Sequence, residues 1–559
     1  MAPSSPSNAA SLSAASLSAE SQEATAEQRK ELRMADYVAK MQIASPEVLR
    51  VTPAHMALCR FGKAFRDTEE KLFHKSKRSQ EIERFWSHSW HGNSWAKVLT
   101  LFVLYNGLPA AVLGTLAAAV MMVLFSLEVL PGFNRTPGIP DAESSVWSLC
   151  AGLLVYAIVL VQWRPQQRVF FDRVCISEDD PDLKAKAIRS LAGMLKNSKQ
   201  MLVLWDQSWS TRLWCLFELA AFLKCKKAKS EQVLIVRPTL VGPCSITVFT
   251  TVSAGMLGVL TFPVLASPDA RFWAAATLLP LAGFVACFSA AFVVAFVYLR
   301  RYFHSVHTFV EKLRSGNFDE VACSCCQQNH VNKRGQQIVC DREVVKRCVV
   351  AWFGSVAAFE DIINEEVVDV VARELREGVF TRSWALQVGA PLLWGLMDIA
   401  AIFFRYSFWG IGFDLAATGI IVWLLVVPLV LEVTTFLIRR FCSSSRTCCS
   451  TLSGLFCQLA TFFLIGLFVL LILAAWSWPK FLITVHDLKY SLWSGAFLGQ
   501  VLLMAGLVIL MEWLVGKPKL ERSPVPDSIS HSCGPGNNLE VEEQDLEETV
   551  PADRVEITL

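Results

Sequence analysis

Glu218 is the first residue whose type and position suit chemistry, and it lies in the string RLWCLFELAAF, residues 212–222. The pattern predicts a helix over residues 210–223, with Glu218 in its second turn, between buried strands at 201–205 and 233–236. A carboxylate there lies beside the carboxyl end of a parallel sheet, where open α/β folds bind ligands. It could stabilise an oxocarbenium-like centre, as glycosidase carboxylates do. A structural glutamate is the alternative.

A second group of reactive side chains lies in the string ACSCCQQNHVNKRGQQIVC, residues 322–340. Several thiols and one imidazole in so short a stretch suit a tetrahedral Zn²⁺ ion. Gly335 allows a turn that would bring the distal cysteine back to the others. The spacing matches no standard zinc finger, and reduced or acylated cysteines are the alternative. The candidate ligands are Cys323, Cys325, Cys326, His330 and Cys340.

Two carboxylates, Asp398 and Asp414, lie inside apolar runs at residues 385–404 and 411–438. An ionisable side chain inside a membrane is energetically costly, so each is a candidate for function. Both would lie toward the outer half of the membrane, close to Arg405. The alternative is an ion pair that fixes one helical hairpin.

The elements around Glu218 alternate between strand and helix. The apolar run at 169–172 predicts a buried strand. Asp180 and Pro181 then supply an N-cap and a first-turn proline, and apolar residues follow at helical spacing. Together with the strands on either side of the Glu218 helix, this order indicates βαβ units and a parallel sheet.

Trp214, Cys215, Glu218 and Leu219 resemble the W-C-x-x-E-L signature of the TIR (Toll/interleukin-1 receptor) domain. The preceding LVLWDQSW is similar to the TIR strand that ends in a Ser-x-aromatic turn, and VFFD resembles the second strand of the family. The resemblance implies a flavodoxin-like parallel sheet. It places the first strand upstream, at residues 84–90 (RFWSHSW), so that an apolar segment divides the domain.

The resemblance also implies roles for single residues. In TIR domains that cleave NAD⁺, the signature glutamate holds the ribose and is catalytic, which assigns that role to Glu218. His88, at the end of the first strand, would face the same ligand, and Trp209 and Trp214 could stack on a ring of NAD⁺. A satisfied histidine and core packing of the tryptophans are the alternatives. Many TIR domains keep the motif and act by assembly.

The composition indicates a polytopic membrane protein. Of 559 residues, 53% are hydrophobic and only 18% charged, and a soluble chain of this length would carry more charge. The net charge of +2 argues against a nucleic-acid partner. Apolar runs predict about eight spans in the lipid bilayer. They form four hairpins, at residues 108–163, 246–299, 385–438 and 454–515.

The hairpin count puts both termini and every long connection on one face of the membrane. Basic residues gather on that face, so the positive-inside rule places it in the cytosol, where cysteines are reduced or metal-bound. The fold class is therefore an α-helical polytopic membrane protein with a cytosolic α/β domain. The other segments are a disordered tail at 1–25, a charged helical region at 26–82, the divided TIR-like domain at 83–97 and 166–238, a Cys/His-rich module at 300–382 and an acidic disordered tail at 520–559.

Three functions fit this organisation. The first is signalling or assembly at the membrane, through association with itself or with other TIR-like domains. The second is a membrane-bound NAD⁺ hydrolase that uses Glu218. The third is a transporter or channel that depends on Asp398 or Asp414 and is regulated by the TIR-like domain.

Overall fold

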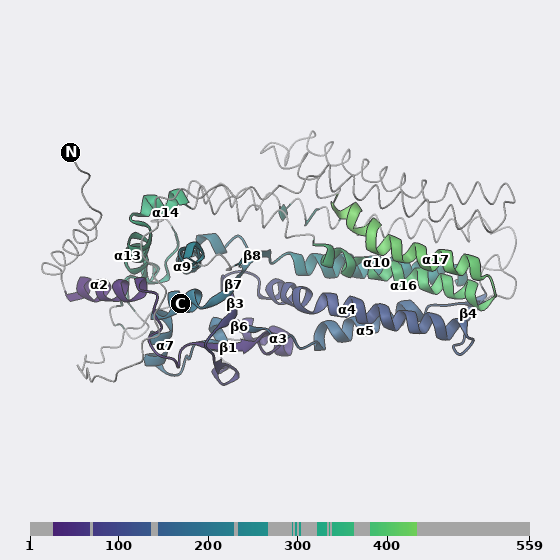
Figure 1. The fold of residues 1–559 in the computed structure, drawn as a ribbon, viewed down its shortest axis with the longest axis horizontal. Helices are drawn as coiled ribbons and strands as arrows, with labels where there is room; N and C mark the ends of the chain where they lie inside the picture. The colour runs from purple at the N-terminus through teal and green to yellow at the C-terminus, as the bar shows by residue number, and fades with distance from the viewer. Residues whose placement is uncertain are drawn as a thin grey trace.

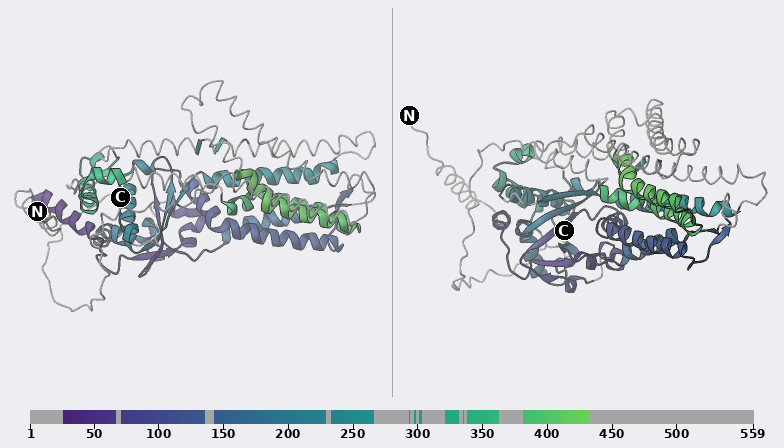
Figure 2. Two further views of the ribbon diagram at one scale, coloured as in Figure 1. Left: turned by 45° about the horizontal axis from the view of Figure 1, so that its top comes forward. Right: turned by 45° about the vertical axis from the view of Figure 1, so that its right-hand side comes forward.

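The computed structural model describes residues 26–66, 71–135, 143–228, 233–265, 293, 297–298, 301–302, 321–331, 335, 338–362 and 381–432. A sheet with its covering helices lies at one end, and long apolar helices lie side by side beyond it (Figure 1). The two further views give the same arrangement (Figure 2).

The sheet has six strands in the order β2-β1-β6-β3-β7-β8. The four strands β6, β3, β7 and β8 are parallel, and in chain order they follow the flavodoxin-like sequence 2-1-3-4. Strand β1 pairs antiparallel with β6 and with β2, so the sheet is mixed. The strands are β1 (Arg50–Pro53), β2 (Lys77–Arg78), β3 (Ile82–His88), β6 (Arg168–Phe170), β7 (Ser198–Trp205) and β8 (Val233–Pro238).

Strands from the two parts of the divided domain are neighbours in this sheet. Arg84 of β3 pairs with Val169 of β6, and Phe85 pairs with Phe170. This confirms the expected pairing of the first strand with the second. The chain between them leaves the sheet and returns through α4 (Ser94–Ser126) and α5 (Trp147–Gln162).

The region at 26–82 was expected to be helical, and the sheet was expected to be wholly parallel. Both expectations are wrong, because this region also contributes two strands that pair antiparallel. Helix α2 (Ala26–Ala39) is present, but β1 and β2 follow and extend the sheet. Val51 and Thr52 are buried in β1, where branched side chains favour a strand. Pro53 ends that strand and precedes α3 (Ala54–Gly62).

Successive side chains of each central strand point to opposite faces of the sheet. Phe85, Met201 and Val203 pack on one face, with α8 (Leu191–Lys196), α9 (Leu213–Ala228), α2 and α13 (Asp341–Phe353). Trp86, Leu202 and Leu204 pack on the other, with α3 and the start of α4. Helix α7 (Pro181–Arg189) begins at the predicted cap, because the Asp180 side chain accepts from the amides of Asp182 and Leu183.

Within the described part of the chain, four helices are long and apolar enough to cross a membrane, which is consistent with a membrane protein. They span Ser94–Ser126, Val241–Thr261, Arg382–Arg405 and Trp409–Glu432, and α5 is a shorter apolar helix. In Figure 1 they include α4, α10 (Val241–Leu265), α16 (Arg382–Arg405) and α17 (Trp409–Ile421). The expected spans at 454–476 and 492–515 lie outside the described residues, as does nearly all of 272–299.

Helix α4 belongs to both parts of the molecule. Its first turns pack on the sheet, where Val98, Leu101 and Phe102 are buried with Trp86. Its later turns expose apolar side chains such as Leu116, as a lipid-facing helix does. Its 33 residues extend about 50 Å at 1.5 Å per residue. The α/β domain is therefore joined to the bundle through a continuous helix.

Candidate functional site

Polar side chains converge at the carboxyl ends of β3 and β7. Strand β6 lies on one side of β3 and β7 on the other, so the strand order changes direction between β3 and β7. Open α/β sheets bind ligands at such a switch point. Ser87 is the last residue but one of β3, Asp206 and Ser208 follow β7, and α9 brings Glu218 to the same place. These residues define the switch-point cluster.

Glu218 is held by a short chain of hydrogen bonds. The Ser87 hydroxyl donates to Glu218 Oε2 at 2.5 Å, and the Trp209 indole Nε1 donates to Ser87 Oγ at 3.0 Å. Trp209 is only 2% exposed, whereas Glu218 is partly accessible. The carboxyl group is thus oriented from the sheet side. The Trp209 ring is packed in the core and its indole orients Ser87, so its position does not support stacking on a ligand.

Burial raises the pKa of Glu218 to about 8, and the negative charge of Asp172 adds to the rise. The hydrogen bond from Ser87 acts in the opposite direction, because it stabilises the carboxylate. At neutral pH the side chain is therefore mainly a carboxylic acid. A pKa this close to the working pH is typical of a group that takes part in acid–base or electrostatic catalysis.

The loop after β3 is tied to the loop after β7. Ser208 Oγ lies 2.8 Å from Ser89 Oγ and donates to Asp206 Oδ1 at 2.5 Å. The buried Lys97 ammonium donates to the Ser89 carbonyl, and to the Gly92 carbonyl at 3.3 Å. Its distance to Asp206 Oδ2 is 3.9 Å. Sequence analysis did not select these residues, although short Ser- and Asp-rich strings after two strands were a usable signal.

His88 faces away from Glu218, which corrects its expected place beside the same ligand. As the residue after Ser87 in β3, it points to the opposite face of the sheet. Its Nε2 lies 3.4 Å from Asp172 Oδ1, and Trp90 donates to Asp172 Oδ2 at 3.0 Å. Burial alone would raise the pKa of Asp172, but the His88 charge and these hydrogen bonds outweigh it and lower the pKa.

Trp214 also lies apart from Glu218. Its indole Nε1 donates to Asp341 Oδ2 at 3.3 Å, and its ring meets Phe217 edge-on, with centroids 5.4 Å apart. The contact joins the signature helix α9 to the cysteine-rich segment rather than to the switch-point cluster. Stacking of Trp214 on a ligand at Glu218 is therefore not supported by its position.

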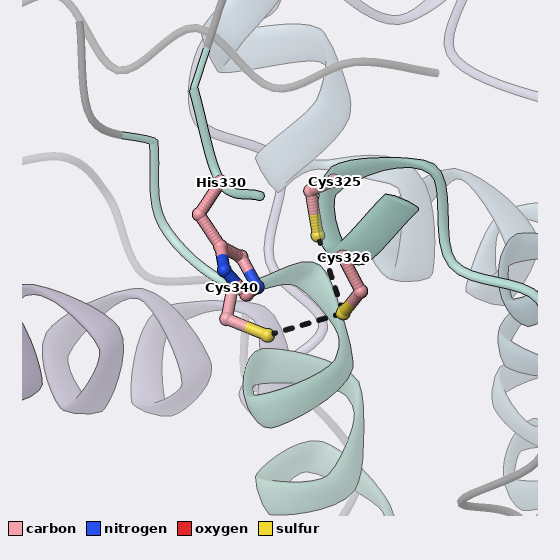
Figure 3. A group of neighbouring side chains, drawn as sticks. All are labelled: Cys325, Cys326, His330 and Cys340. Carbon is pink, nitrogen blue, oxygen red and sulfur yellow. Dashed lines mark hydrogen bonds between the residues drawn. The ribbon is translucent and has the colours of Figure 1, made fainter. Parts of the chain in front are cut away.

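Cys325, Cys326, His330 and Cys340 form a group that could hold a metal ion, with all ligand atoms within 4.8 Å of one another. Figure 3 shows the three thiols and the imidazole turned toward a common space. The Sγ atoms of Cys326 and Cys340 are 3.8 Å apart, and those of Cys325 and Cys326 are 4.0 Å apart. Thiolates on a tetrahedral zinc ion lie about 3.8 Å apart. His330 Nε2 is buried with no hydrogen-bond partner among the described residues, as a metal ligand would be.

Cys323 falls in a second group, with Cys325 and Asp341. Its Sγ lies 3.1 Å from that of Cys325, closer than two ligands on one tetrahedral ion. Hydrogen bonding with the Cys325 side chain lowers the pKa of Cys340 to about 4 and that of Cys323 to about 5. The same bonds raise the pKa of Cys325. The group thus concentrates negative charge where a cation could bind.

Asp398 acts as a helix cap inside the bundle. It is fully buried and accepts hydrogen bonds from Ser145 Oγ at 2.6 Å, from the Ser148 amide at 2.9 Å and from the Leu149 amide at 2.8 Å. The last two amides are in the first turn of α5, where a carboxylate is favourable. These bonds account for the buried charge without a transport role.

Arg405 does not pair with Asp398, contrary to the expected ion pair. It lies 3.4 Å from Glu143 and donates to the Leu130 carbonyl at 2.9 Å. Asp414 is partly buried in α17.

Comparison of the chain with protein-family models, with curated proteins and with solved structures finds no match.

Proposed function

We propose that the chain is an integral membrane signalling protein whose TIR-like α/β domain lies in the cytosol and cleaves NAD⁺. The proposal is carried by the hydrogen-bonded chain Trp209–Ser87–Glu218 at the switch point of the sheet. That chain orients the carboxyl group of a half-buried glutamate at the place where this type of sheet binds ligands.

The reaction breaks the bond between the nicotinamide nitrogen and C1′ of its ribose. The bonding electrons leave with nicotinamide, and C1′ acquires oxocarbenium character that a nearby carboxylate stabilises. Water then adds to C1′ and releases a proton, which yields ADP-ribose. Glu218 in its ionised form supplies the negative charge. The positive charge of bound NAD⁺ favours ionisation of Glu218, despite a pKa of about 8 in the free protein.

The test is nicotinamide release by purified full-length protein in nanodiscs, followed by chromatography. Release by the wild type that falls at least about a hundredfold in Glu218→Ala supports the proposal. Glu81→Ala is the matched control, because Glu81 is exposed and pairs with Lys199 on the surface. Absence of release from folded wild-type protein, or equal release from Glu218→Ala, would reject it.

A second candidate function is signalling by self-assembly. The exposed loop at residues 178–182 favours it. Residues 178–182 are all exposed and include Glu178, Asp179 and Asp182. No side chain from Leu213 to Cys225 in α9 is exposed, so this loop is more accessible to a partner than the signature helix. Mass photometry should then find a dimer that Asp182→Lys dissociates. An unchanged mass distribution in that variant would exclude this surface.

We propose Zn²⁺ as the ion for Cys325, Cys326, His330 and Cys340, because three thiols and one imidazole are a common structural zinc site. Elemental analysis should give one zinc per chain, and Co²⁺ substitution should give the spectrum of a tetrahedral thiolate site. Cys340→Ser should lose the metal, whereas Cys59→Ser, at an exposed free cysteine, should keep it. Zinc-free wild-type protein that stays folded and does not take up Co²⁺ would refute the assignment.

A further inference from the structure

We propose that the metal-binding group positions the helix that carries Glu218, and that Asp341 is the positioning residue between them. The expected effect on NAD⁺ cleavage rests on the proposed function, whereas the mechanical link between the two sites does not. Three sets of contacts join residues 321–331 and 338–353 to α9.

The first set is a backbone connection at the start of α9. Ala322 forms a parallel bridge with Arg212, immediately before the helix. Its amide donates to the Thr211 carbonyl at 2.9 Å, and its carbonyl accepts from the Leu213 amide at 3.3 Å. Leu213 begins α9, where backbone amides have no partner inside the helix. The residue next to Cys323 thus satisfies an amide of the helix N-terminus.

The second set runs through Asp341. Its side chain accepts from Trp214 Nε1 at 3.3 Å, and its own amide donates to Cys325 Sγ at 3.3 Å. Asp341 is 4% exposed, so this contact is shielded from water. One residue therefore contacts a metal ligand through its backbone and the first turn of α9 through its side chain. Hydrogen bonds from backbone amides to metal ligands orient those ligands.

The third set holds the far end of α9. Lys224 Nζ donates to the Trp352 carbonyl at 2.7 Å, and the Trp352 ring packs on Phe217 with centroids 5.6 Å apart. Helix α13, which begins at Asp341 directly after Cys340, therefore contacts α9 along its length. The metal-binding group (Cys325, Cys326, His330 and Cys340) lies between Ala322, which forms the bridge to Arg212, and the start of α13. An ion there would fix both to one point.

The consequence concerns the geometry of Glu218. One helical turn separates Trp214 from Glu218. The Ser87–Glu218 hydrogen bond is 2.5 Å long, so a displacement of the first turn of α9 by about 1 Å would break it. Release of the metal, or of the Asp341 contact, would therefore disorder the switch-point cluster while the strands stay paired.

The experiment is hydrogen–deuterium exchange by mass spectrometry on full-length protein in nanodiscs. Asp341→Ala removes the acceptor for Trp214 but keeps the backbone amide at Cys325, so the metal should remain bound. Exchange in the peptide that covers the start of α9 should become about tenfold faster, as expected for loss of one buried hydrogen bond. Exchange in β7 should stay unchanged. Asp341→Asn keeps an acceptor oxygen and is the conservative control, expected to restore near-wild-type exchange.

Removal of the metal with 1,10-phenanthroline should give the same local increase in α9, and added Zn²⁺ should reverse it. Unchanged α9 exchange in Asp341→Ala would overturn the inference. If the chelator speeds exchange throughout the protein, the metal-bound Asp341→Ala variant alone tests whether Asp341 positions α9. Nicotinamide release is measured on the same samples. Wild-type protein without release would reject the proposed function, while faster α9 exchange in Asp341→Ala would still support the link.

Discussion

Raising the pH from 6 to 8 should lower the free energy of unfolding of the wild-type protein more than that of Glu218→Gln. The pKa of Glu218 is about 8 in the folded protein against 4.5 for the free side chain. Between these values the folded state holds a proton that the unfolded chain has lost. The stabilisation is therefore complete below pH 4.5, declines as the pH rises toward 8, and does not change further above it.

The size of the effect follows from the pKa difference. Each pH unit well inside the window removes about 1.4 kcal/mol, and the slope halves at the folded pKa, so the interval from pH 6 to 8 removes about 2 kcal/mol. The glutamine side chain introduced by Glu218→Gln cannot ionise but keeps an oxygen that accepts from Ser87. Its contribution is therefore independent of pH. Titrating groups that do not interact with Glu218 occur in both proteins and cancel in the difference.

The assay is reversible unfolding of both proteins in nanodiscs at several pH values, followed by tryptophan fluorescence. The wild type should lose stability relative to the variant as the pH rises. Infrared spectroscopy gives a direct check, since a protonated carboxyl band should disappear near pH 8 and be absent from Glu218→Gln. Parallel pH dependence of the two proteins, with no such band, would show that Glu218 is ionised at neutral pH and refute the reasoning.

Three other predictions concern separate contacts. Nicotinamide release, if catalysed by ionised Glu218, should rise as the pH approaches 8, because the pKa lies there; a rate that falls over pH 6–8 would contradict this. Asp398→Ala should lower the free energy of unfolding by about 3 kcal/mol, because buried donors of α5 lose their acceptor, whereas Asp398→Asn keeps an acceptor and should lose less; equal stability of both variants and the wild type in thermal unfolding would contradict the capping role. Gly92→Ala should destabilise the α/β domain by about 1–3 kcal/mol, because a Cβ there would lie 1.8 Å from Asp206 Oδ2; an unchanged unfolding midpoint would contradict the close approach.

Local sequence signals predicted much of the α/β domain. The alternation of apolar runs located β6, β7 and β8, and Asp180 with Pro181 located the start of α7. Strand β3 was expected only from the resemblance to TIR domains. The predicted helix after Asp180 is interrupted at Ser190, where α7 ends and α8 follows. Strands β1 and β2 were not predicted, because short edge strands of four and two residues carry little periodic signal.

Some residues of the candidate sites could be predicted from the sequence, and others could not. Residue types and spacing selected Cys323, Cys325, Cys326, His330 and Cys340, because thiol and imidazole chemistry is a property of the side chains. The resemblance to the TIR signature selected Glu218. Neither selected Ser87, the hydrogen-bond partner of Glu218, which lies 131 positions away. Nor did they separate Ser87 from His88, whose opposite directions depend on the pleat of β3.

By itself the sequence determined which segments are apolar, where the parallel strands and the helices between them lie, and which side chains can bind a proton or a metal. Tertiary structure decided which of these side chains meet. Trp214 finds Asp341 across 127 positions, and Asp398 caps α5 across about 250 positions. Such pairs depend on how helices pack on the sheet and on one another. That packing is decided by the whole set of buried surfaces rather than by the propensity of any one segment.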